Sequence, residues 1–144
     1  MEMHSEILKP MAVLAAWTMF MWLWMYATRI PAMGAAKVDA DALVKQGGQT
    51  LDDILPANVQ WKAHNYNHLH EAPTVFYAVA LTLALLDAGA GLNAQIAWFY
   101  VGMRVVHSLV QATVNHQTSR FLLFLLSTVA LMALIVRAAM IVFG

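Results

Sequence analysis

Four apolar runs alternate with polar segments along the chain. They cover residues 11–27, 72–86, 96–114 and 121–143, and the first of them contains no charged residue. A helix needs roughly 20 apolar residues to cross a bilayer core, with a lower limit of about 17, and each run reaches this length together with its flanks. The pattern therefore predicts an all-α integral membrane protein with four spans.

The second span is expected to begin upstream of its apolar run. Pro56 marks a natural start, so the helix should run from about Ala57 into the apolar residues. Pro73 would then lie inside it, which membrane helices tolerate where neighbouring groups satisfy the freed carbonyl. Asp87 and the glycines after it are expected to end this helix.

The connections between the runs differ in length. The first, residues 29–60, is long, whereas the turns near residues 89–93 and 115–119 are short. Short links favour antiparallel neighbours, so we expect a four-helix up-down bundle with both termini on one side. The whole chain, residues 1–144, is expected to form this single domain.

Composition supports the membrane assignment and sets the orientation. Apolar residues make up 61% of the 144 residues and charged residues 11%, whereas about a quarter of a soluble domain is charged. The basic residues expected on the side of the long loop are Arg29, Lys37, Lys45, Lys62 and Arg120; near the other side only Lys9 stands close to a span. The positive-inside rule therefore places the long loop in the cytoplasm.

The net charge and the cysteine count limit the possible functions further. The formal net charge is zero and no basic stripe is present, which disfavours binding to nucleic acid. The absence of cysteine excludes disulfides and thiolate metal sites. Arg137, inside the fourth run, is expected to extend to the far interface; the alternative is a pair with Glu2 or Glu6.

Polar side chains crowd the start of the second span, in the sequence HNYNHLHEAP of residues 64–73. In a helix, the positions i, i+3, i+4 and i+7 share one face, whereas Asn65 and His70 would point elsewhere. The residues at these four positions are His64, Asn67, His68 and Glu71. Such a face has to turn toward protein, a water-filled cavity or another subunit, because lipid does not solvate it.

A second polar stripe follows the third run. Its members are Arg104, His107, Ser108, Gln111 and Asn115, and Arg120 comes next, at the start of the fourth run. Because both stripes lie at the cytoplasmic ends of their spans, we expect them to meet in one polar cleft.

Three interpretations of this cleft are open. It is structural if its side chains pair with one another, as Glu71 would with Arg104. It is a metal site if His64, His68 and Glu71 supply three ligands. It is a pocket for an anionic or polar ligand if Arg120 supplies a fixed positive charge.

The segments NHLHEAPTVFY and RVVHSLVQATVNHQTSR resemble the MAPEG family, the membrane-associated proteins of eicosanoid and glutathione metabolism. The likeness covers nearly the whole chain, and the chain resembles a bacterial branch of the family that has ExPxxFY in place of the standard pattern. It implies a homotrimer in the bacterial inner membrane, with pockets between adjacent subunits that bind glutathione near the cytoplasmic face. Arg120 matches the family arginine that stabilises the glutathione thiolate, and Arg29 matches one that reaches the ligand from a neighbouring subunit.

The chain departs from the family pattern at the second span. The family carries an Arg, an Asn four residues later and a Glu three residues after that. If Asn67 and Pro73 set the register, the Arg falls on Ala63 and the Glu on His70. If Glu71 sets it, the Arg falls on His64 and the Asn on His68. In the third span, Gln111 stands where the prostaglandin E synthase branch has Tyr.

The resemblance implies a glutathione-dependent transferase or peroxidase that acts on a lipophilic electrophile or a lipid hydroperoxide. Arg120 would be the catalytic residue, and no bound metal is expected. The residues expected to bind the ligand are Arg29, His64, Asn67, His68, Glu71, Arg104, His107 and Gln111. The alternative is a non-catalytic membrane protein, or an accessory subunit of a larger membrane complex, whose cleft binds lipid.

Overall fold

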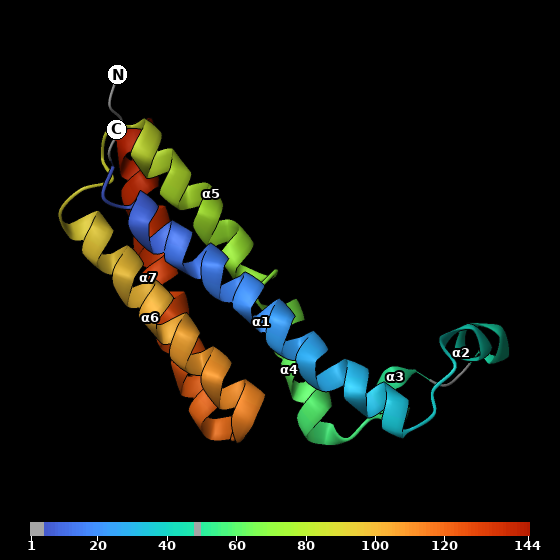
Figure 1. The fold of residues 1–144 in the computed structure, drawn as a ribbon. Coiled ribbons are helices and arrows are strands. Elements are labelled where there is room, and N and C mark those ends of the chain that lie inside the picture. Colours follow the sequence, from blue (N-terminus) through green and yellow to red (C-terminus); the bar gives the residue numbers. More distant parts are fainter. Residues whose placement is uncertain (1–4, 48–49) are drawn as a thin grey trace.

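The computed structural model describes residues 5–47 and 50–144. Its elements are α1 (Leu8–Ala35), α2 (Ala40–Gln46), α3 (Leu51–Ile54), α4 (Ala57–His68), α5 (Ala72–Leu85), α6 (Leu92–Thr113) and α7 (Gln117–Phe143). Within these residues there is no β-strand (Figure 1), so the prediction of an all-α protein is confirmed.

Four columns of helix lie alongside one another: α1, α6, α7, and α5 with α4 below it (Figure 1). α6 packs most extensively on α7, and α1 packs on α4, α5 and α6. The start of α1 and the end of α7 lie at the same end of the molecule, as the sequence predicts. We call this the terminal end (residues 5–9, 86–93 and 137–144), and the opposite part the loop end (residues 28–47, 50–71 and 104–120).

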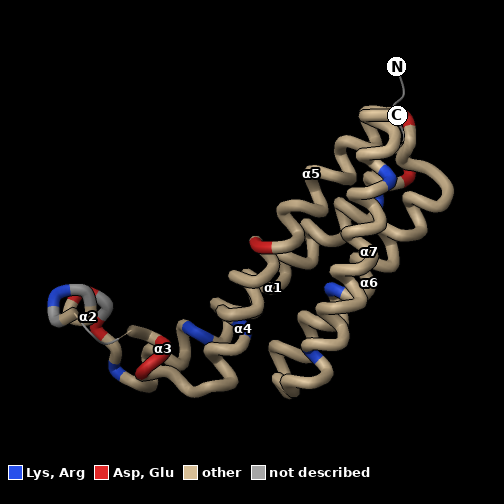
Figure 2. The backbone as a smooth tube through the Cα atoms, turned by 180° about the vertical axis from the view of Figure 1, so that it is seen from behind, with Lys and Arg blue, Asp and Glu red and all other residues tan. Residues whose placement is uncertain are grey.

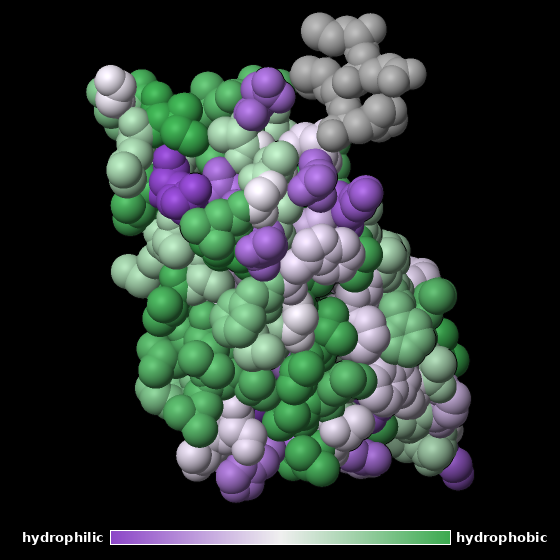
Figure 3. Space-filling view, turned by 90° about the vertical axis from the view of Figure 1, so that its left-hand side faces the viewer, coloured by the Kyte–Doolittle hydropathy of each residue, from purple (hydrophilic) through white to green (hydrophobic). Residues whose placement is uncertain are grey.

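Two helices are long and apolar enough to cross a membrane, α1 with 28 residues and α7 with 27. At about 1.5 Å per residue each is roughly 40 Å long, which exceeds the roughly 30 Å of a bilayer core. Large apolar side chains on them are exposed, among them Leu23, Val129 and Met140. A broad hydrophobic zone separates hydrophilic ends in Figure 3. An exposed apolar surface of this extent is typical of contact with lipid or with other subunits.

Many of the charged residues lie on α2, α3 and the segment before α2, whereas α4 carries Lys62 and α6 carries Arg104 in its middle (Figure 2). The middle parts of α1, α5 and α7 carry none of them. This segregation matches a chain whose apolar middle faces lipid while its loop end faces water.

The prediction of one continuous second helix is wrong. The start at Ala57 is confirmed, but α4 ends at His68 and α5 begins only at Ala72, with Pro73 in its first turn. A proline inside a helix clashes with the carbonyl four residues earlier, here that of Leu69, whereas in the first turn its missing N–H has no cost. The helix is therefore interrupted at residues 69–71, and the polar residues on its two sides no longer share one face.

Close contacts hold the terminal end together. The Ile7 N–H donates to the Gly89 carbonyl oxygen over 2.9 Å. A Cβ atom on Gly89 would lie 1.9 Å from Ser5 Oγ and 2.7 Å from Ile7 Cγ2, so a side chain at this position has no room. Residues 5–7, which we call the N-terminal strap, thus pack directly on the turn between α5 and α6.

Arg137 joins α7 to α6 at this same end. Its Nε atom donates to Asn93 Oδ1, and Asn93 Nδ2 donates in turn to the Ala88 carbonyl oxygen over 2.7 Å. Neither of the ion pairs in the described part of the chain involves Arg137, so a pair with Glu6 is not formed, and Glu2 lies outside the described residues. The sequence predicts that Arg137 extends to the far interface. In the structure its side chain is hydrogen-bonded to the buried Asn93 at this end of the molecule.

Candidate ligand-binding site

The polar stripe of α6 is buried. Arg104 and Ser108 are 0% exposed, His107 2% and Gln111 5%. They lie on the side of α6 that faces α4 and α7, because the opposite side carries the exposed apolar residues Val106 and Leu109. Asn115 ends the stripe in the turn to α7, where it adopts the left-handed conformation with φ 51°.

His68, the last residue of α4, lies between Glu71 and Arg104. Arg104 Nη2 and His68 Nδ1 are 2.8 Å apart, and His68 Nε2 is 3.8 Å from Glu71 Oε2. The direct pair of Glu71 with Arg104, which the structural interpretation of the cleft contained, is thus replaced by a chain of three residues. It runs from an exposed carboxylate through a half-buried imidazole to a wholly buried guanidinium.

Aromatic contacts fix the His68 ring. Its centroid lies 5.0 Å from that of His107 with an interplanar angle of 18°, so the two rings are stacked. The ring of Phe124, on α7, lies 5.9 Å from His68 and 6.5 Å from His107. Side chains from α4, α6 and α7 therefore meet at this point and bring together residues far apart in the sequence.

The other predicted residues of α4 lie outside this cluster. His64 is exposed, and its Nε2 lies 3.1 Å from Asp52 Oδ2 in α3. Asn67 is exposed as well. His64, Asn67 and His68 still share one side of α4 by their spacing, but Glu71 follows the break, so the prediction that all four share one helical face is wrong. α4 turns another side inward, which leaves His64 and Asn67 exposed. In the described part of the chain, no group of three or more His, Asp or Glu side chains is placed to hold a metal ion.

The inward side of α4 carries two polar residues that sequence reasoning missed, Lys62 and Asn65. Lys62 Nζ donates to the Ala112 carbonyl oxygen over 3.2 Å and lies 5.1 Å from the ring centroid of Trp24. Asn65 Nδ2 donates to Ser108 Oγ. The spacing of Val59 with Lys62 and Asn65, at i, i+3 and i+6, is the signal in the sequence that indicates this face.

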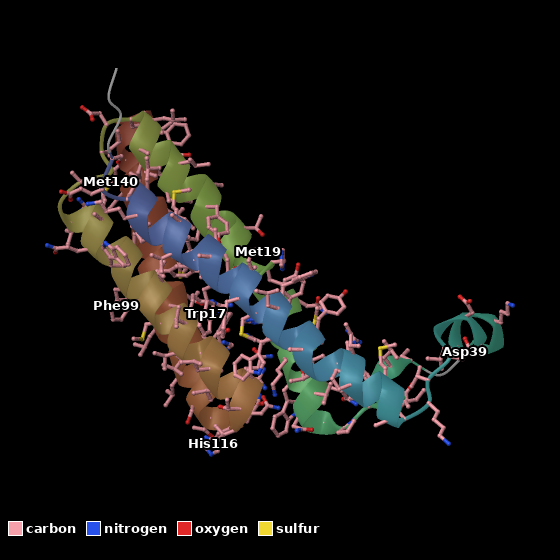
Figure 4. All side chains as sticks on the ribbon, viewed as in Figure 1. Trp17, Met19, Asp39, Phe99, His116 and Met140 are labelled. Atoms are coloured by element: carbon pink, nitrogen blue, oxygen red, sulfur yellow. The ribbon has the colours of Figure 1, made fainter. Side chains whose placement is uncertain are left out.

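Arg120 lies in the first turn of α7, close to His116, which marks the turn between α6 and α7 in Figure 4. Its Nη1 donates to Asn115 Oδ1 over 2.7 Å. Arg29, near the end of α1, forms no hydrogen bond or ion pair with the other predicted site residues within the described chain. Of the nine predicted residues, the structure thus gathers His68, Glu71, Arg104 and His107 directly.

Several buried polar atoms have no hydrogen-bond partner within residues 5–47 and 50–144. They are Trp17 Nε1, Arg29 Nε, Asn65 Oδ1, Tyr100 OH, Arg104 Nε and Nη1, His107 Nδ1, Gln111 Oε1 and Arg120 Nε. Five of these nine atoms lie on α6, in Tyr100, Arg104, His107 and Gln111. Only one of the three guanidinium nitrogens of Arg104 has a partner among the described residues. Because a buried polar atom without a partner costs about 1–3 kcal/mol, this concentration makes the inward side of α6 the candidate binding site.

Two apolar grooves flank α6. The groove between α1 and α6, of about 480 Å³, is lined by Trp17, Phe20, Leu23, Trp24, Ala27 and Leu109. The groove between α6 and α7, of about 390 Å³, is lined by Gln95, Ile96, Phe99, Leu126, Val129, Ala130 and Ala133. Trp17 lies between α1 and α6 in Figure 4. Both grooves are lined mainly by apolar side chains, which are suited to acyl chains or other lipophilic molecules.

Comparison with models of known protein families identifies the family of this chain. The model of the MAPEG family matches residues 7–140, nearly the whole chain. The chain belongs to the MAPEG family. Comparisons with curated proteins and with solved structures find no match. Since MAPEG proteins are helical membrane proteins, α1 and α7 are interpreted as membrane spans rather than as core helices of a soluble protein.

Proposed function

We propose that this MAPEG protein is a membrane-embedded glutathione-dependent transferase or peroxidase that acts on lipophilic electrophiles or lipid hydroperoxides. The observation that carries the proposal is Arg104, which is 0% exposed and has neither a carboxylate partner nor partners for Nε and Nη1 among the described residues. A permanently charged group that is buried in this way needs a compensating anion.

Glutathione fits the polarity of this environment. Its carboxylates are suited to the free N–H groups of Arg104, and the carboxylate of Glu71 is suited to its amino group. His107 and Gln111, which each have a buried atom without a partner, are proposed to contact the same molecule. His64, Asn67 and Arg29 lie apart from the cluster in one chain and are proposed to complete a pocket across the boundary between subunits of a homotrimer.

Arg120 is proposed to stabilise the thiolate of glutathione. A nearby permanent cation favours the ionised thiol, and the thiolate is the nucleophile. In a transferase reaction the sulfur forms a bond to the electrophilic carbon, and the thiol proton leaves with the displaced group or protonates the adduct. In a peroxidase reaction two glutathione molecules reduce the hydroperoxide to an alcohol and water and are joined in a disulfide.

The proposed membrane topology is a four-span up-down bundle. α4 and α5 together form the second span, because the 14 residues of α5 measure only about 21 Å, which is too short for a bilayer core. The loop end lies on the cytoplasmic side of the bacterial inner membrane, as the positive-inside rule predicts. A lipophilic substrate arrives laterally, along the apolar grooves beside α6.

Titration calorimetry with reduced glutathione tests the proposal on purified protein in lipid nanodiscs. We expect binding by the wild type and loss of binding in Arg104→Met. Arg120→Ala should keep part of the affinity and lose conjugation of a chlorinated dinitrobenzene and reduction of an organic hydroperoxide. If the wild type does not bind glutathione at millimolar concentration, the proposal is wrong.

A non-catalytic, lipid-binding protein or accessory subunit is the second candidate. The two grooves beside α6 favour this lipid-binding function, because most of the residues that line them are apolar. Native mass spectrometry of gently solubilised membranes separates the candidates. A complex that retains lipid or a further subunit, together with no response to glutathione, would favour this second function.

A further inference from the structure

We infer that His68 is a positioning residue that holds the guanidinium of Arg104 in place for an anionic ligand, while the ring itself is held by Glu71, His107 and Phe124. The role of the ligand rests on the proposed function, but the contact between His68 and Arg104 does not. The inference assigns to His68 a task that differs from direct ligand contact.

The chemistry of the two groups determines the protonation of the ring. A guanidinium only donates hydrogen bonds, so the 2.8 Å contact of Arg104 Nη2 requires a lone pair on His68 Nδ1. The neutral ring then carries its proton on Nε2. This nitrogen is 3.8 Å from Glu71 Oε2, a distance at which the carboxylate attracts the N–H bond without a direct hydrogen bond.

The surroundings leave the ring little freedom to turn. It is stacked on His107 at 5.0 Å, and Phe124 covers it at 5.9 Å. It also belongs to the last turn of α4, directly before the break at residues 69–71. Glu71, which lies in the break, approaches Nε2 of the ring, whereas Arg104 contacts Nδ1, so the two residues meet different nitrogens of His68.

As a result, one N–H group of Arg104 is hydrogen-bonded to His68, and the Nε and Nη1 donors remain for a ligand. His68 takes one N–H of Nη2, whereas Nε and Nη1 have no partner in the described chain. Because a side chain as long as that of Arg loses considerable rotamer entropy when it is fixed, an anchor that acts before the ligand arrives increases the affinity.

The variants differ in what they leave at the position of Nδ1. His68→Asn places an amide oxygen there and keeps an acceptor for Arg104, while His68→Leu keeps bulk and removes the acceptor. His70→Leu is the matched control, because His70 is exposed and its ring contacts the carbonyl oxygen and the ring of Tyr66, away from Arg104. Glutathione affinity is measured by calorimetry in nanodiscs, and folding by thermal unfolding of the same samples.

We expect His68→Leu to weaken glutathione binding about tenfold or more, and His68→Asn and His70→Leu to remain within about threefold of the wild type. Rescue by Asn separates the anchoring role from a merely structural one. If His68→Leu binds like the wild type, or if Asn weakens binding as much as Leu does, the inference is wrong while the proposed function survives.

NMR of the ¹⁵N-labelled histidines tests the inference without a ligand. The wild type should show His68 with an unprotonated Nδ1, and the Nδ1 signal should shift in Arg104→Met. A protonated Nδ1, or a signal unchanged in Arg104→Met, overturns the inference. This measurement tests the contact between His68 and Arg104 even if the His68→Leu variant does not fold. It also tests that contact if the wild type does not bind glutathione; in that case the proposed function is wrong, but the contact can still be confirmed.

Discussion

The two ends of the molecule satisfy their polar groups in opposite ways. At the terminal end, Arg137 and Asn93 are bonded to each other, and Gly89 admits the N-terminal strap with no space left over. None of the buried atoms without a partner lies there among the described residues. At the loop end, Arg104, His107 and Gln111 are buried and each has an atom without a partner.

This difference suggests that one end of the molecule contributes mainly to stability and the other to the proposed binding of a ligand. Both Arg104 and Arg137 lie within helices and contact an uncharged amide or a histidine ring instead of a carboxylate, but only Arg104 has buried donors without a partner among the described residues. We therefore interpret the terminal end, whose buried polar groups are paired, as a rigid base, and the loop end as the proposed binding site. Changes at the terminal end should therefore affect folding, and changes at the loop end should affect binding.

The largest effect is expected from Arg104→Met. Removal of the buried cation should weaken glutathione binding about a hundredfold, or about 3 kcal/mol, because several charge-assisted hydrogen bonds are lost. The midpoint of thermal unfolding without ligand should not fall, since the loss of a buried charge with few partners is often neutral or stabilising. Calorimetry and thermal unfolding of the same nanodisc samples measure both quantities.

Arg137→Met is the matched control at the other end. It should leave glutathione affinity within about twofold of the wild type and lower the unfolding midpoint, because Asn93 Oδ1 loses its donor. Equal effects of the two substitutions on binding would break the division into a structural and a functional end.

Gly89→Ala is expected to destabilise the protein by about 1–3 kcal/mol, since the new methyl group would overlap Ser5 Oγ and Ile7 Cγ2. Denaturant unfolding in detergent measures the change. Gly102→Ala in the middle of α6 is the control, because nothing lies within 4 Å of its Cβ position, and it should stabilise the helix by about 0.5–1 kcal/mol. A Gly89→Ala variant as stable as the wild type would contradict the close packing of the strap.

Asn93→Ala should cost about 1–2 kcal/mol. The side chain donates to the Ala88 carbonyl oxygen and accepts from Arg137, so both bonds are lost within a buried environment. Glutathione binding by the folded protein should not change. Thermal unfolding of Asn93→Ala, Arg137→Met and the double variant forms a cycle, and additive effects would show that the two residues do not interact.

The smallest effect is expected from Asp52→Asn. The pair of Asp52 with His64 is about half exposed, with side-chain exposures of 51% and 45%, and surface ion pairs contribute about 0–1 kcal/mol. We expect a change below about 0.5 kcal/mol that disappears at high salt. A larger loss of stability would show that the docking of α3 on α4 belongs to the rigid part of the fold.

The sequence by itself determined the helical class, the positions of α1, α6 and α7, and the polar stripe of α6, because on α6 the polar and apolar residues segregate clearly by helical spacing. It also carried the MAPEG likeness that the family model confirms. In each case the signal lies within one helix, where periodicity alone specifies which residues share a side.

Only the tertiary structure decided which side of α4 turns inward. α4 is polar nearly all round, so its spacing favours His64 and Asn67 as readily as Lys62 and Asn65, and the choice depends on contacts with Trp24, Ser108 and Ala112 in other helices. The contact of Arg104 with His68, 36 residues earlier, depends in the same way on the packing of α4 against α6. Partners this far apart in the chain meet only through packing, which no local pattern records.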